Sequence, residues 1–199
     1  MFQRAHSSRG HRLRRPFTAL TALGTIAHHG FELRSGVGLV FEPFLGRRGA
    51  VALWTVQLPG WLLSALSSDD ERVEKLLALS NGMGLSGAVV HFVEWPWERR
   101  RGIPYLTEAE GLTGEQLPAY NTILHLWFAS GLLAVLTETP RHARRWALLG
   151  VLLGEPLRRS ARHHFRWARE QAIKDPERWS PVLREPREAV SSVSASGGR

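Results

Sequence analysis

Cysteine is absent from the 199-residue chain, so disulfide bonds, thiolate metal sites and cysteine nucleophiles are excluded. Any metal ion would need histidine, carboxylate or water ligands. The chain also lacks a G-x-x-x-x-G-K phosphate loop, a G-x-G-x-x-G motif after a predicted strand, a G-x-S-x-G nucleophile motif and an H-E-x-x-H zinc motif. The soluble enzyme classes that depend on these motifs are therefore not indicated.

Lysine is scarce, since only two of the 26 basic residues are lysines and the rest are arginines. The net charge of +8 could suggest nucleic-acid binding. The arginines, however, flank apolar segments and do not gather along one amphipathic face, as the positive-inside rule expects of a membrane protein. We therefore expect a lipid bilayer as the partner of this chain, and no nucleic acid.

Charged residues are few in the middle of the chain, where apolar residues gather between Phe17 and Leu157. The clearest apolar run is Lys75 to Trp97, which has no charge between Lys75 and Glu94 and is rich in glycine and serine. About 20 such residues are enough for a helix to cross a bilayer core of about 30 Å. Small residues in its middle also allow close helix packing in lipid.

The sequence thus predicts an all-α integral membrane helical bundle with about four transmembrane helices. The expected parts are a basic cytoplasmic arm (1–16), a membrane-embedded helical domain (17–157), a basic amphipathic helix (158–174) and a disordered tail (175–199). Expected spans begin at Phe17, Gly49, Lys75 and Tyr120. A fifth crossing through WALLGVLLGEPL is the alternative, although it would place the basic tail outside. The protein is expected in the cell membrane, multi-pass, with both termini cytoplasmic.

Two local features are also predicted. Pro59-Gly60 near the centre of the second span predicts a kink. Residues 98–119 form the longest internal loop, and Thr107 with Glu110 fits a capping box for a short surface helix.

Polar residues of three spans are expected at a common depth near the outer face of the bilayer. At 1.5 Å per residue, His28 and His29 lie about 18–20 Å along the first span, and His91 lies about 24 Å beyond Lys75. The fourth span runs back inward, which puts His125 about 7 Å from its outer end. Ionisable groups at membrane depth normally face one another or a cavity. The expected pocket contains His28, His29, Glu32, His91, Glu94, Asn121 and His125.

This pocket allows several kinds of chemistry. A metal ion (Fe, Zn or Mn) could be held by His29, Glu32, His91, Glu94 and His125. A haem b between spans could use two of His28, His29, His91 and His125 as axial ligands. Alternatively, a set of four residues would act as acid and base on a lipid-like substrate: His91, Glu94, His125 and Asn121. The competing interpretation is a non-catalytic membrane subunit or scaffold in which the cluster only stabilises the bundle.

Overall fold

The structure is a computed structural model that describes residues 14–67 and 70–185. These residues are mostly helical. The helices are α1 (Pro16–Arg34), α2 (Glu42–Ser67), α3 (Glu71–Glu94), α4 (Leu117–Leu133), α5 (Arg144–Leu152) and α6 (Gly154–Lys174). A π-helical segment, Ala134–Glu138, continues α4, and short 3-10 helices cover Arg141–Ala143 and Pro181–Arg184. The strands β1 (Trp97–Arg100) and β2 (Ile103–Leu106) form an antiparallel hairpin.

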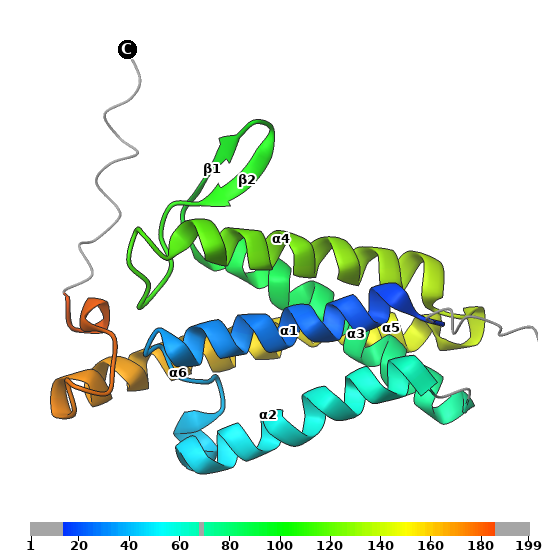
Figure 1. Ribbon diagram of the computed structural model, residues 1–199, viewed down its shortest axis with the longest axis horizontal. Helices are drawn as coiled ribbons and strands as arrows, with labels where there is room; N and C mark the ends of the chain where they lie inside the picture. The colour runs from blue at the N-terminus through cyan, green and yellow to red at the C-terminus, as the bar shows by residue number, and fades with distance from the viewer. Residues whose placement is uncertain (1–13, 68–69, 186–199) are drawn as a thin grey trace, which may run out of the picture.

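The helices lie roughly along the long axis of the molecule: α1 to α4 alternate in direction, and α5 and α6 together run opposite to α4 (Figure 1). Only Leu153 separates α5 from α6, so the two form a nearly continuous rod that begins beside the start of α1. At the other end of α1, the backbone N–H of Ser180 donates to the carbonyl of Gly36 (3.0 Å). The first and last described residues therefore lie at opposite ends of the bundle.

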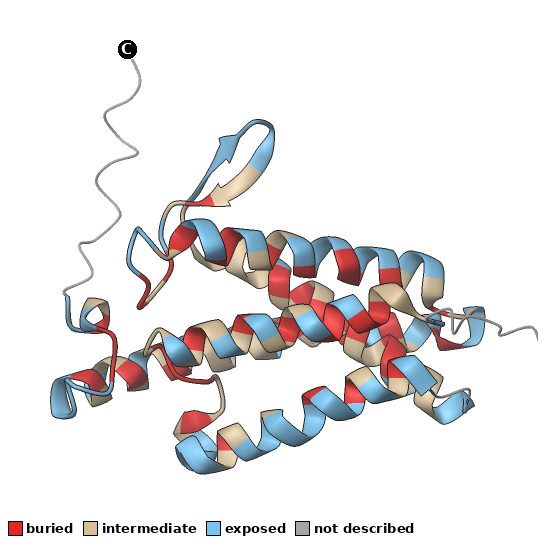
Figure 2. Cartoon of the chain, in the orientation of Figure 1, coloured by how far each residue is buried: buried red, intermediate tan, exposed pale blue. Residues whose placement is uncertain are grey.

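Glycines allow α3 and α5 to approach very closely. A Cβ on Gly82 would overlap the carbonyl oxygen of Ala147, and a Cβ on Gly150 would overlap that of Leu79. Such backbone-to-backbone contact between small residues is typical of helices that associate in lipid. The α5–α6 rod is thus held along α3 through most of its apolar part, and buried residues run along the inner faces of the helices (Figure 2).

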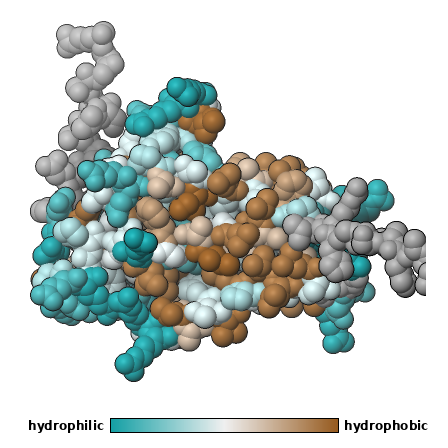
Figure 3. Space-filling model, in the orientation of Figure 1, coloured by the Kyte–Doolittle hydropathy of each residue, from teal (hydrophilic) through white to brown (hydrophobic). Residues whose placement is uncertain are grey.

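Three helices of the described chain are long and apolar enough to cross a membrane: α2 with 26 residues, α3 with 24, and α4 with its π-helical extension, Leu117–Glu138, with 22. Their outward faces carry large exposed apolar side chains, including those of Val56, Leu63, Leu76, Val93, Leu126 and Leu136. In the view of Figure 3 hydrophobic residues form a broad surface over the middle of the molecule, while its left end is hydrophilic. This is the surface expected of a protein that faces lipid around its middle.

The non-helical residue inside α2 is Gly46, and Pro59, where a kink was expected, lies within the continuous helix. Gly46 has φ 64° and ψ 168°, a conformation that side-chain-bearing residues rarely adopt, while Pro59 and Gly60 remain within the helix. A single proline inside a long helix removes one hydrogen bond but does not have to end the helix. The glycine, in contrast, permits a turn that redirects the chain from the loop after α1.

The loop after α3 folds as a hairpin, and residues 107–110 are irregular where a short helix was expected. Arg101 and Gly102 both have positive φ, 51° and 84°, which is the geometry of a two-residue hairpin turn. Asn121 on α4 fixes the end of β2: its side chain accepts from the Leu106 N–H (2.7 Å) and donates to the Leu106 carbonyl (3.1 Å). These tertiary hydrogen bonds of Asn121 determine the conformation of the loop more strongly than the local capping-box pattern of Thr107 and Glu110 does.

The chain after α6 docks on the bundle as far as it is described. Trp179 and Leu183 are buried, and Arg178 forms an ion pair of 2.9 Å with the buried carboxylate of Glu42. Disorder was expected from residue 175, and the difference for 175–185 follows from these contacts. Residues 186–199, like residues 1–13 of the basic arm, lie outside the described part of the chain.

Candidate functional site

One turn near the end of α1 places two histidines and a glutamate on one face. Glu32 follows His29 by three residues and His28 by four, which is the spacing of neighbours on a helix surface. The Oε2 atom of Glu32 lies 3.4 Å from His28 Nε2 and 3.7 Å from His29 Nδ1. His28 and Glu32 are buried. Three donor groups of α1 thus converge inside the bundle.

The spacing of these groups is close to that of ligands on one metal ion. One ligand atom from each of His28, His29 and Glu32 can be chosen so that all lie within 4.8 Å of one another. Two ligand atoms bound to one tetrahedral ion at 2.0–2.2 Å are about 3.3–3.6 Å apart. The widest separation in the group would therefore have to close by roughly 1.2–1.5 Å, which requires side-chain rotations when an ion binds.

His91 on α3 adds a fourth group to this cluster. Its ring lies edge-on to the His28 ring, with 4.8 Å between the centroids. Its Nδ1–H donates to the Gly87 carbonyl at 2.7 Å, which leaves the Nε2 lone pair free for a ligand. A backbone carbonyl that fixes the tautomer in this way is the usual support of a metal-binding histidine. We call His28, His29, Glu32 and His91 the His/Glu cluster.

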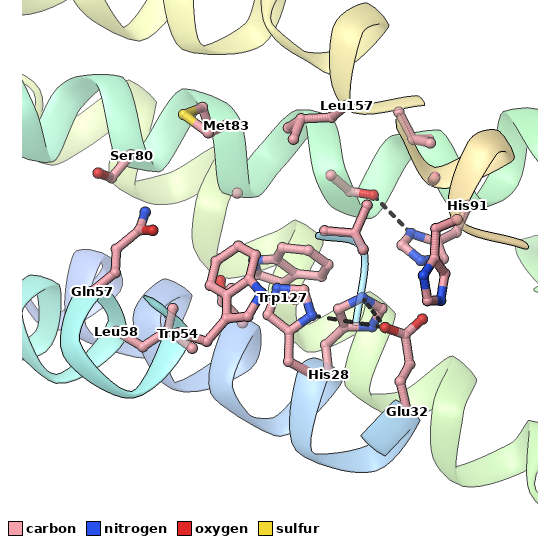
Figure 4. Close-up of a pocket in the computed structure, with 18 of the residues that line it drawn as sticks. His28, Glu32, Trp54, Gln57, Leu58, Ser80, Met83, His91, Trp127 and Leu157 are labelled. Carbon is pink, nitrogen blue, oxygen red and sulfur yellow. Dashed lines mark hydrogen bonds and ion pairs between the residues drawn. The ribbon is translucent and has the colours of Figure 1, made fainter. Parts of the chain in front are cut away.

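Neighbouring side chains hold the cluster in place (Figure 4). The buried hydroxyl of Tyr120 on α4 donates to Glu32 Oε1 at 3.0 Å. The indole of Trp127 stacks on His28 with centroids 4.9 Å apart, and that of Trp54 lies 4.1 Å from the His29 ring. Buried polar atoms are nearly always hydrogen-bonded, yet His28 Nδ1 and His29 Nδ1 have no such partner in the described structure. His28 Nδ1 is therefore free to bind a ligand, whereas His29 Nδ1 faces Glu32 Oε2 at 3.7 Å.

A cavity of about 130 Å³ adjoins the cluster and extends between α2 and α3. In Figure 4 the cluster lies at one end, while Gln57 and Ser80 lie at the other. Between them the wall is mostly aromatic and aliphatic, and it includes Trp54, Leu58, Trp61, Met83, Trp127, Leu157 and Phe165. The site thus combines a polar end with an apolar chamber.

His164 on α6 also lines this cavity, although it lies in the segment 158–174 that was expected to be a basic amphipathic helix. Its Nε2–H donates to the Val37 carbonyl (3.1 Å), and its Nδ1 is buried without a hydrogen-bond partner in the described structure. Burial lowers the pKa of His164, while the Glu32 carboxylate and the bond to Val37 act in the opposite direction. The amphipathic spacing of α6, which places residue 164 on the same face as Ala161 and Ala168, is the signal that could have found it.

The structure places the other three expected site residues outside the cluster. Glu94 binds Arg158 (2.7 Å) and Arg162 (2.6 Å) of α6. His125 Nε2 donates to the Pro104 carbonyl at 2.7 Å, and Asn121 holds the hairpin as described above. All three tie peripheral elements to α3 or α4. Of the seven residues expected in one pocket, the structure brings together His28, His29, Glu32 and His91.

The chemistry open to the cluster follows from its donors. Three imidazoles and one carboxylate are nitrogen and oxygen ligands of the kind that Zn, Fe and Mn bind. The same groups can accept and transfer protons. No protein-family model, curated protein or solved structure matches this chain, so its function must be inferred from the site itself.

Proposed function

We propose that this chain is an integral membrane protein that binds a divalent transition-metal ion in its His/Glu cluster and uses it in a reaction on a lipid-like substrate. His28, His29 and Glu32 are the three ligands, and His91 is a neighbouring acid–base group beside them. The observation that carries the proposal is the convergence of ligand atoms of His28, His29 and Glu32 within 4.8 Å of one another, together with the buried His28 Nδ1, which has no hydrogen-bond partner in the described structure.

A catalytic role fits this ligand set better than a purely structural one. Structural zinc sites are closed by four protein ligands, whereas catalytic zinc sites use three and keep one position open. Two histidines and one carboxylate with open positions are also the ligand set of non-haem iron enzymes. Here the cavity supplies space beside the cluster for a substrate group. An ion in this place would act as a Lewis acid on a bound oxygen.

An ion also fits better than haem. Two imidazoles that bind one iron from opposite faces of a haem have ring centroids on the order of 6 Å apart, since each nitrogen lies about 2.0 Å from the metal. The rings of His28 and His29 are 4.9 Å apart and those of His28 and His91 4.8 Å. These separations leave no slot for a macrocycle between the rings.

The geometry supports five antiparallel passes through the cell membrane better than four. Five passes are the alternative that the sequence left open. α2, α3 and the extended α4 have the required length and hydropathy, and α1 runs beside them. Gly82 and Gly150 hold α5 along α3, so that α5 and the first turn of α6, as far as Leu157, form the fifth pass. The arginine-rich remainder of α6 then lies outside the apolar zone, and the His/Glu cluster lies close to that end of the bundle.

The metal content of the purified protein tests this proposal. Protein in detergent is incubated separately with Fe²⁺, Zn²⁺ and Mn²⁺, desalted, and analysed by elemental mass spectrometry. We expect one ion per chain for the natural sequence and a loss to below about a tenth for His28→Ala and Glu32→Gln. His125→Ala is the matched control, because this histidine lies on α4 away from the cluster, and it should keep the ion.

Circular dichroism and size-exclusion profiles show whether each variant is folded. A folded natural protein that binds none of the three ions would contradict the proposal and favour the scaffold interpretation. Equal metal content in the natural protein and in Glu32→Gln would also contradict it, because the bound ion would then lie elsewhere.

A further inference from the structure

Three indole N–H groups around the cavity lack an acceptor. Trp54, Trp61 and Trp127 all line the cavity, and the Nε1 atom of each is buried without a hydrogen-bond partner among the described residues. A buried tryptophan normally finds a partner for its N–H, because an unpaired donor loses its bond to water without replacement. Three such donors around one cavity point to a ligand that brings acceptor atoms.

The donors come from two helices that enclose the chamber. Trp54 and Trp61 are seven residues apart, and hence on one face of α2, and Trp127 comes from α4. On the side of α3 there is no room for larger side chains at Gly84 and Gly87. A Cβ on either residue would lie only 2.8–2.9 Å from its nearest neighbour. The indoles therefore set the shape of the chamber.

The lining also restricts the charge of the ligand. Among the described residues that line the cavity there is no arginine or lysine, so no permanently charged side chain beside the indoles would pair with a phosphate headgroup. The neutral donors match a neutral oxygen acceptor, such as the carbonyl of an ester or a quinone.

The size of the cavity limits how much of the ligand it can enclose. Its volume of about 130 Å³ resembles that of an engineered cavity of about 150 Å³ that accepts benzene. A compact head group fits, but a long chain does not. Gln57 lines the cavity and is exposed, so the chamber reaches the outer surface of α2, where Leu53 and Val56 are also exposed. An attached apolar chain would leave there into lipid.

We propose that the cavity binds a neutral membrane lipid whose carbonyl-bearing head lies against these indoles and whose apolar chain leaves beside Gln57. The inference deepens the proposed function, on which it rests for one point only: the head lies next to the metal-binding cluster and is the part that reacts. Two sources share this chemistry, a fatty-acyl ester and a lipid quinone.

Photo-crosslinking tests the inference directly. Two probes carry a diazirine on a long chain, one with a methyl ester head and one with a quinone head, and each is cross-linked to the detergent-solubilised full chain. We expect labelled peptides from α2 and α3 around Trp54 and Met83. Methyl dodecanoate should compete at least about tenfold better than dodecane, which lacks the carbonyl. Labelling by one probe alone would support the inference and identify the source. Equal competition by the ester and the alkane would overturn it.

Matched variants locate the binding site. Ser80→Leu fills the far end of the cavity without touching the cluster, and it should lower labelling at least about tenfold. Leu76→Phe is the control, because residue 76 is exposed on α3 and does not line the cavity. Trp61→Phe keeps an aromatic ring but removes one N–H, so it should weaken the ester several-fold and leave dodecane unchanged. Labelling unaffected by Ser80→Leu would contradict the inference.

The metal measurement separates the two proposals. If the protein binds an ion in its cluster but the carbonyl probes do not label the cavity, the inference fails while the proposed function stands. If the folded protein binds no ion yet shows carbonyl-dependent labelling around Trp54, the metal-dependent function fails while the lipid site stands.

Discussion

Tyr120 on α4 donates a hydrogen bond of 3.0 Å to Glu32 on α1, and both side chains are buried. This contact joins α1 and α4 through two residues that are 88 positions apart in the sequence. It leaves the other carboxylate oxygen, Oε2, facing His28 and His29. One hydroxyl thus both links the helices and orients the carboxylate of the His/Glu cluster.

Replacing Tyr120 by phenylalanine should weaken metal binding while leaving the ligands in place. Loss of an orienting partner typically reduces metal affinity 10- to 100-fold, so we expect a change of about this size in the dissociation constant. The unpaired carboxylate oxygen should also lower the free energy of unfolding by about 1–3 kcal/mol. Metal titration and thermal unfolding measure both effects. Tyr105→Phe, on the hairpin, is the control and should change neither.

Replacing Glu94 by glutamine should affect the attachment of α6 and not the metal. Glu94 binds two arginines of α6 and lies outside the His/Glu cluster. We expect unchanged metal content and faster amide hydrogen exchange in α6, because these ion pairs tie that helix to α3. Loss of the ion from a folded Glu94→Gln protein would instead show that Glu94 acts on the site.

Replacing Gly82 by alanine should disrupt the contact between α3 and α5. The new methyl group would overlap the carbonyl of Ala147, which belongs to the backbone and cannot move without shifting the helix. We expect a loss of stability of about 1–3 kcal/mol or more, seen as a lower melting temperature in detergent. A Cβ on Gly60 in α2 meets no atom within 4 Å. Gly60→Ala should therefore be neutral or slightly stabilising. Equal melting temperatures for the two variants would contradict this packing.

The burial of His164 predicts a loss of stability in mild acid. Its pKa is lowered in the folded protein, so the unfolded chain binds the proton more readily. The contribution of neutral His164 to the free energy of unfolding is therefore fully present above the unfolded pKa of about 6.5. This contribution is lost as the pH falls from there towards the lower pKa of the folded state. The nearby titratable groups are Glu32 and His163.

The melting temperature between about pH 7.5 and pH 5.5 tests this expectation. His164→Gln keeps a donor for the Val37 carbonyl but does not titrate, so it should show a smaller drop than the natural protein. The exposed neighbour His163 provides the matched control, since His163→Gln should behave like the natural sequence. A drop in His164→Gln as large as in the natural protein would assign the effect to other groups.

Helix spacing and depth were sufficient to predict part of the site. His28, His29 and Glu32 share a face through their i, i+3 and i, i+4 spacing, and the rise per residue put His91 at a similar level. Depth, however, does not fix the direction in which a side chain points. Trp127 faces the cluster, and His125, two residues earlier and about 200° around the helix, therefore points away towards the hairpin.

Long-range partners explain the remaining differences. The carboxylate of Glu94 is captured by arginines that lie 64 and 68 residues further along the chain, which no local pattern reveals. His164 looked like part of a basic surface helix, but α6 packs its small residues inward, and Ala168 and Ala172 are fully buried. The hairpin depends on Asn121, whose buried amide acts only after the tertiary structure brings it beside Leu106.

The opposite placement of the first and last described residues has a topological consequence. The five passes proposed above are an odd number, so in a membrane they would place Arg14, before α1, and Glu185, after α6, in different aqueous compartments. Reporter proteins fused to the two ends test this topology, with one reporter active only in the cytoplasm and the other active only outside it. We expect the cytoplasmic reporter to be active at one end of the chain and the other reporter to be active at the opposite end. Activity of the same compartment-specific reporter at both ends would instead require that the α5–α6 rod lie outside the bilayer.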